Sequence, residues 1–160
     1  MDRLEQVRQI VDEILRHQPD LEESRCGFVH LYGVASICAL LALKRGLDPQ
    51  ICAVAGMLHD IASYQTGDPI NHAQRSALEA EKILCGVDGF SQKEIDAVSL
   101  AISKHSAKDK KDGELAELLK DADVLQHYLY NPTLPREPDH VWRQRGRNTL
   151  AELTIELHIE

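Results

Sequence analysis

The chain has 160 residues, 43% of them hydrophobic and only 4% aromatic, with a formal net charge of -8. This length is typical of one domain, and it can bury a full core built from aliphatic side chains. The acidic balance argues against a nucleic-acid backbone or an anionic membrane as the main partner. A phosphate-bearing substrate would need local positive charge at its site.

Cysteine usage and the chain's apolar runs bear on its location. The four cysteines form no C-x-x-C pattern, so we expect buried, reduced thiols. The N-terminus has no signal-peptide pattern, and the apolar run over 34–43 is too short to span a bilayer. We expect a soluble, cytoplasmic protein with no membrane partner, as a monomer or homodimer.

The first half of the chain is expected to form three helices. Apolar residues three and four positions apart predict an amphipathic helix over 2–17 and a more buried one over 27–45. Asp48 and Pro49 suit an N-cap and a first helical position, and they begin a third helix over 49–62.

Capping patterns mark the next two helices. After a loop over 63–71, Asn71 with Gln74 resembles a capping box that opens a fourth helix. Ser91 with Glu94 resembles a second box, which opens a fifth helix.

The last two predicted helices span 114–130 and 139–157. No stretch alternates apolar and polar residues for long enough to form a strand. We therefore predict a single all-α domain over 1–160, with about seven helices, a core over 26–130 and the last helix packed on that core.

Histidines and acids recur at buried or helix-end positions of these helices. His30 falls on the apolar face of its helix, and a carboxylate such as Asp123 on an apolar face is costly to bury without a partner. The set with this character is His30, His59, Asp60, His72, His105 and Asp123. Imidazole and carboxylate ligands suit Fe, Mn, Co, Ni or Zn.

The run Gly-Met-Leu-His-Asp-Ile over 56–61, with His30 upstream and Asp123 downstream, resembles the HD superfamily of metal-dependent phosphohydrolases. The resemblance covers about 26–130 and implies that family's helical bundle. It implies one divalent ion held by His30, His59, Asp60 and Asp123. It implies a second ion at His72 and His105 in two-metal members, with Asp60 bridging the two.

Small bacterial members with this ligand pattern include dinucleoside tetraphosphate hydrolases, and the layout here is similar to theirs. The resemblance implies hydrolysis of a phosphate ester or phosphoanhydride of a small nucleotide-like substrate by metal-activated water, with His59 and Asp60 catalytic. Basic residues are candidates for binding substrate phosphates: Lys104, Lys108, Arg143 and Arg147. His127, one turn after Asp123, is a candidate for supporting a metal ligand.

Two other interpretations stay open. Ser63 stands where many HD proteins have lysine, and the stretch 124–128 departs from the tetraphosphatase pattern. These departures favour a non-catalytic domain in which the metal stabilises the fold or takes part in sensing a ligand. The other interpretation is a mononuclear nucleotidase that does not use His72 and His105.

Overall fold

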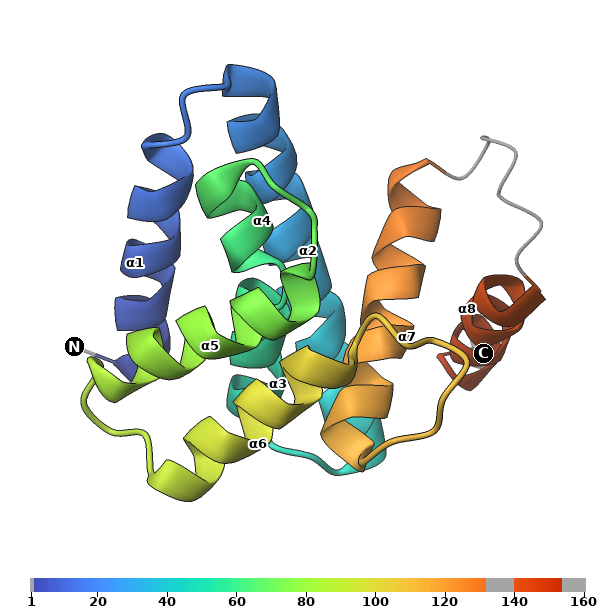
Figure 1. The fold of residues 1–160 in the computed structure, drawn as a ribbon. Helices are drawn as coiled ribbons and strands as arrows, with labels where there is room; N and C mark the ends of the chain where they lie inside the picture. The colour runs from blue at the N-terminus through green and yellow to red at the C-terminus, as the bar shows by residue number, and fades with distance from the viewer. Residues whose placement is uncertain (1, 132–139, 154–160) are drawn as a thin grey trace, which may run out of the picture.

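The computed structural model describes residues 2–131 and 140–153, and its regular elements are all α-helices (Figure 1). In chain order they are α1 (Arg3–Arg16), α2 (Leu21–Arg45), α3 (Pro49–Leu58), α4 (Ile61–Thr66), α5 (His72–Cys85), α6 (Gln92–Lys104), α7 (Glu114–Tyr130) and α8 (His140–Glu152). The all-α prediction is confirmed for the described residues, which form eight helices where about seven were expected. Residues 139 and 154–157 of the last predicted helix lie outside the described ranges.

The additional helix is α4, where the sequence predicted the end of the third helix and the start of a loop. The third helix was expected to continue to residue 62, but α3 ends at Leu58, and His59 and Asp60 form a turn before α4 begins. The prediction was wrong because the apolar pattern continues across the break, with Ile61 fully buried at the start of α4. Apolar periodicity indicates which residues are buried, but it does not reveal that a short turn separates two helices.

Side chains cap several helix starts. Asp48 accepts hydrogen bonds from two backbone N–H groups at the start of α3, and Ser91 forms the predicted capping box with Glu94. The predicted box of Asn71 with Gln74 is wrong. Asn71 has a φ of 51° and makes no side-chain cap, and this left-handed conformation is one that asparagine tolerates.

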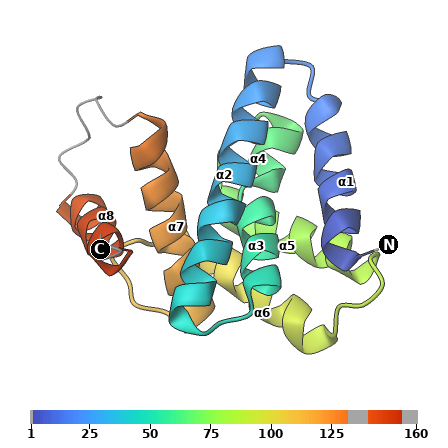
Figure 2. The same ribbon diagram turned by 180° about the vertical axis from the view of Figure 1, so that it is seen from behind.

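Helix α2 is the centre of the bundle. It contacts α1, α3, α4 and α7, and α8 packs against α7 at the edge (Figures 1 and 2). It begins at Leu21 instead of the predicted residue 27, because Asp20 caps a charged first turn that has no apolar periodicity. By length and composition α2 could cross a membrane, but this is weak evidence, since the core helix of a soluble protein passes the same test.

A glycine allows α2 and α3 to approach closely. A Cβ atom on Gly56 would lie 2.7 Å from Ala35 Cα and 2.8 Å from Ala35 N. These are backbone atoms, so a side chain at this position would force the two helices apart. The close contact matters for the site because α2 carries His30 and α3 leads directly into His59.

The four cysteines are free thiols, but they are not all buried as expected. Cys38 and Cys52 lie in the core, Cys26 is half-buried and Cys85 is exposed. Cys85 is the last residue of α5.

Candidate metal centre

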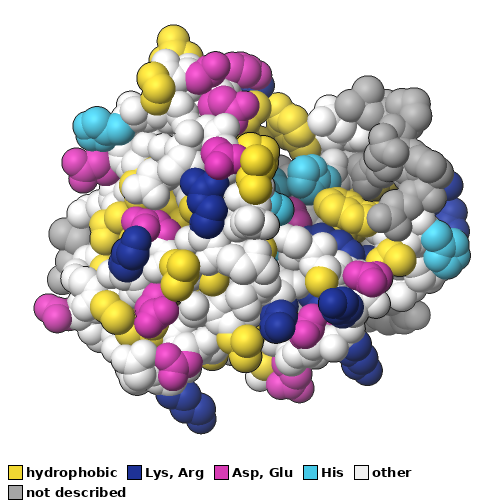
Figure 3. Space-filling model, viewed as in Figure 1, with side chains coloured by type: hydrophobic (Ala, Val, Ile, Leu, Met, Phe, Trp, Pro, Cys, Tyr) yellow, Lys and Arg dark blue, Asp and Glu magenta, His cyan; other side chains and the backbone are white. Residues whose placement is uncertain are grey.

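The six predicted ligands come together from five parts of the fold. His30 lies on α2, His59 and Asp60 form the turn after α3, His72 begins α5, His105 follows α6 and Asp123 lies on α7. The side chains of His30, His59, His105 and Asp123 are buried, and those of Asp60 and His72 are half-buried. On the face drawn in Figure 3, histidine side chains are visible in a hollow beside the grey residues.

One group of ligand atoms surrounds Asp60 Oδ2 and Asp123 Oδ1. His30 Nε2 lies 3.6 Å from Asp60 Oδ2, 3.5 Å from Asp123 Oδ1 and 3.1 Å from His59 Nε2. His59 Nε2 lies 3.4 Å and 3.8 Å from the same two oxygens. Ligand atoms bonded at ~2.1 Å to one ion lie roughly 3–4 Å apart, so this group has the spacing of a metal site.

A second group surrounds the other oxygen of Asp60. His105 Nε2 lies 3.3 Å from Asp60 Oδ1, and His72 Nε2 lies 3.6 Å from it. These three residues also have ligand atoms close enough to hold one metal ion. Asp60 therefore presents one carboxylate oxygen to each group of imidazoles.

The imidazoles are oriented by hydrogen-bond acceptors on their Nδ1 atoms. His30 Nδ1 lies 2.8 Å from Gln126 Oε1, and His59 Nδ1 lies 2.8 Å from its own helix's Gly56 carbonyl. His72 and His105 contact backbone carbonyl oxygens in the same way, at 3.1 Å and 2.8 Å. A neutral imidazole that donates from Nδ1 keeps its lone pair on Nε2, so four lone pairs point toward the carboxylates.

Most of the atoms that face the centre are thus acceptors, and the donors beside them are Lys108 Nζ, which bonds Asp123 Oδ2, and Ser106 Oγ, which lies 3.0 Å from His72 Nε2. Asp60 Oδ1 and Asp123 Oδ1 are buried, and no donor in the described residues forms a hydrogen bond to either oxygen. Buried carboxylate oxygens without hydrogen bonds are costly, and a cation among these atoms would satisfy both oxygens and the Nε2 lone pairs. The residues present therefore fit a divalent metal ion.

The electrostatics keep both acids ionised. Burial by itself would raise the pKa of Asp123, but Lys108 and the neighbouring imidazoles hold that pKa well below its ordinary range. Burial is likewise outweighed at Asp60, whose pKa is lowered by His59, His105 and His30. Both carboxylates are therefore anionic at neutral pH.

The pKa values of two buried imidazoles, His105 and His30, are shifted in opposite directions. Burial lowers the pKa of His105, which favours its neutral, ligating form. Burial also opposes protonation of His30, but hydrogen bonding and charge from Asp60 and Asp123 outweigh it and raise the His30 pKa. A metal ion would therefore compete with a proton at His30.

Lys108, which the sequence analysis named as a candidate for binding a substrate phosphate, lies inside the centre. Its Nζ donates to Asp123 Oδ2 at 2.5 Å and to the His105 carbonyl at 2.8 Å, and the residue is only 6% exposed. It therefore fixes Asp123 so that Oδ1 faces the imidazoles. This contact differs from the substrate contact expected of Lys108.

The other three predicted phosphate-binding residues are exposed. Lys104 is the last residue of α6, and Arg143 and Arg147 lie on α8. Their role in binding substrate stays a prediction.

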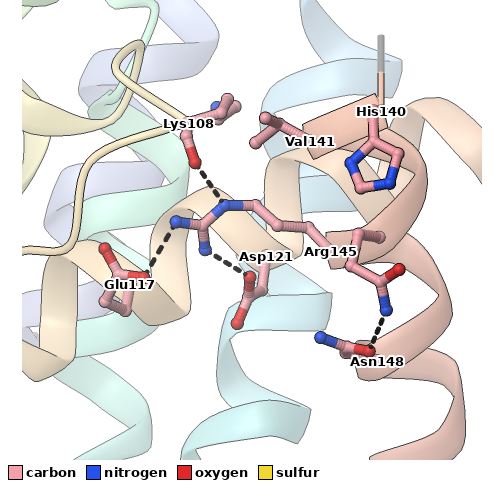
Figure 4. Close-up of a pocket in the computed structure, with 8 residues that line it drawn as sticks. Lys108, Glu117, Asp121, His140, Val141, Arg145 and Asn148 are labelled. Carbon is pink, nitrogen blue, oxygen red and sulfur yellow. Dashed lines mark hydrogen bonds and ion pairs between the residues drawn. The ribbon is translucent and has the colours of Figure 1, made fainter. Parts of the chain in front are cut away.

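A cavity of about 440 Å³ lies beside the centre, between the Lys108 loop, α7 and α8 (Figure 4). Arg145 crosses it and donates to the Lys108 carbonyl at 2.8 Å, to Asp121 at 2.8 Å and to Glu117 at 2.9 Å (Figure 4). This network fixes the Lys108 loop against α7 and α8.

Sequence reasoning missed Gln126 and Trp142. Gln126 lies three residues after Asp123, on a neighbouring part of the same helical face, and this spacing was the available signal. Trp142 gave no such signal, because its contacts with His127 and Lys108 come from the packing of α8 against α7.

The fold and the His/Asp centre together define a helical metal-binding domain. Comparison with protein-family models matches residues 27–128 to the HD domain, and the chain belongs to this family. The match implies binding of a divalent metal, and it begins and ends close to the region of resemblance seen in the sequence. Comparison with curated proteins and with solved structures finds no match to this chain.

Proposed function

We propose that this protein is a metal-dependent phosphohydrolase that cleaves a phosphate ester or phosphoanhydride of a small nucleotide-like substrate. Membership of the HD family supports the reaction class. The proposal depends mainly on the position of Asp60, because its two carboxylate oxygens face two separate groups of imidazoles. That arrangement suits two divalent ions sharing one acid ligand.

Each residue has a definite task in this proposal. His30, His59 and Asp123 would hold the first ion, His72 and His105 would hold the second, and Asp60 would contribute one carboxylate oxygen to each. When bound, the ions supply a water of lowered pKa and neutralise charge on the phosphoryl oxygens.

The surrounding residues orient these ligands. Gln126 and the backbone carbonyls hold the imidazoles with Nε2 directed inward, and Lys108 holds Asp123 in place. Two bound cations would also provide the local positive charge that a phosphate needs in a chain of net charge -8.

A hydrolysis screen tests the proposal. The metal-stripped protein is assayed with nucleotides, dinucleoside polyphosphates and cyclic dinucleotides in the presence of Mn²⁺, Fe²⁺, Co²⁺, Ni²⁺ or Zn²⁺. We expect metal-dependent release of product that disappears in Asp60→Asn. The matched control is Asp96→Asn, which makes the same change in charge at an exposed position of α6 and should retain full activity.

One alternative keeps the metal but not the reaction. Ser63, half-buried in α4, stands three residues after Asp60, where many HD proteins have lysine. A protein that binds metal stoichiometrically yet turns over none of these substrates would be a ligand-binding module instead. A single bound ion would favour the mononuclear nucleotidase and leave His72 and His105 outside the metal site.

A further inference from the structure

His127 lies next to the metal centre but is not among the six predicted ligands. It follows Asp123 by four residues on α7, so the two side chains share one face of the helix. Its Nε2 lies 3.4 Å from Asp123 Oδ1, and its ring centroid lies 4.8 Å from that of His30. His30, Asp123 and His127 offer ligand atoms that all lie within 4.8 Å of one another.

The oxygen that His127 approaches is the one that faces the first metal group. Asp123 Oδ1 is buried without a hydrogen-bond partner and lies 3.5 Å from His30 Nε2. Two ligands bonded at ~2.1 Å to the same ion can be at most ~4.2 Å apart, and the 3.4 Å spacing meets that limit. The side chain of His127 is 56% exposed, so it stands on the solvent side of this buried group.

We propose that His127 is an additional ligand of the ion held by His30, His59, Asp60 and Asp123. The inference rests on the metal centre of the proposed function, and it does not depend on the substrate. It predicts that His127 strengthens binding of this ion and has no effect on the ion at His72 and His105. Because only the first ion gains a ligand, the two ions should differ in affinity.

Trp142 provides a spectroscopic report of this contact. Its ring centroid lies 5.6 Å from that of His127, with the rings at 71°, and the chain contains one tryptophan. Binding of a paramagnetic ion by His127 should therefore quench the tryptophan fluorescence of the protein. Ions bound only at His72 and His105 should have a smaller effect.

The test is titration of the metal-stripped full chain with Co²⁺. Calorimetry gives the number and affinities of the bound ions, visible absorption reports the ligands of Co²⁺, and Trp142 fluorescence reports the neighbourhood of His127. The test variant is His127→Phe, which keeps an aromatic ring against Trp142 and removes the ligating nitrogen. The control is His17→Phe, at the exposed end of α1.

We expect His127→Phe to weaken one of two ions at least ~10-fold, because loss even of residues that merely support a ligand costs 10–100-fold. The second ion should be unchanged, the absorption spectrum should change, and quenching should decrease. His17→Phe should match the wild type. Wild-type affinities and spectrum in His127→Phe would overturn this inference alone, whereas a wild-type chain that binds no Co²⁺ would overturn the metal centre as well.

Discussion

The close packing of α2 and α3 can be tested by adding one methyl group. In Gly56→Ala the new Cβ would lie 2.7 Å from Ala35 Cα, and ordinary contact begins near 3.4 Å, so the backbones must separate by about 0.7 Å. Overpacking of this kind costs about 1–3 kcal/mol, and the better helix propensity of alanine returns about 1 kcal/mol. The net loss of unfolding free energy is then up to about 2 kcal/mol, which corresponds to a decrease in Tm of up to roughly 4–8 °C.

The same separation should weaken the metal centre, because His30 and His59 lie on opposite sides of this interface with their Nε2 atoms 3.1 Å apart. Thermal unfolding of the metal-stripped protein and Mn²⁺ titration by calorimetry measure the two effects. The matched control is Gly146→Ala, also in a helix and buried, whose Cβ would meet only the side chain of Val124 at 3.6 Å. Equal stability and equal Mn²⁺ affinity in the two variants would refute the reasoning.

Three further predictions concern the surroundings of the ligands. Gln126→Leu removes the acceptor at His30 Nδ1, so Mn²⁺ affinity should fall about 10–100-fold; unchanged affinity in a calorimetric titration would contradict the role given to Gln126. Lys108→Met leaves Asp123 buried without the ammonium group that pairs with it, so the free energy of unfolding of the metal-stripped protein should fall by about 3–5 kcal/mol in urea. Mn²⁺ should restore much of this stability, and an equal loss with and without Mn²⁺ would argue against the role given to Lys108. The pKa values of Asp60 and Asp123 are lower in the folded state than in the unfolded state, where a carboxyl group has a pKa of about 4. Ionisation of these two groups therefore stabilises the folded protein above about pH 4, and this stabilisation is lost as the pH falls toward their folded-state pKa values. Urea unfolding of the metal-stripped protein should show this loss below about pH 4, with a shallower dependence in Asp60→Asn than in the wild type.

The sequence singled out the histidines and acids that the structure brings together more readily than the residues that contact and orient them. His30 and His105 could be found because each histidine continues an apolar helical face. Asp123 was found because a carboxylate at such a position needs a partner. These signals are local, and helical periodicity is enough to read them.

The supporting residues depend on contacts between distant segments. Lys108 begins a run of polar residues that is typical of a solvated loop, and it is buried only because Asp123 and the Arg145 network hold it. Lys120 is fully buried for a similar reason, through its contacts with Asp112 and Glu117. Periodicity carries no information about such pairings.

Anomalous diffraction from crystals grown with Mn²⁺ tests the central claim most directly. The account predicts two anomalous peaks, one among His30, His59 and Asp123 and one between His72 and His105, with a carboxylate oxygen of Asp60 next to each. The absence of any peak among these side chains would contradict the account.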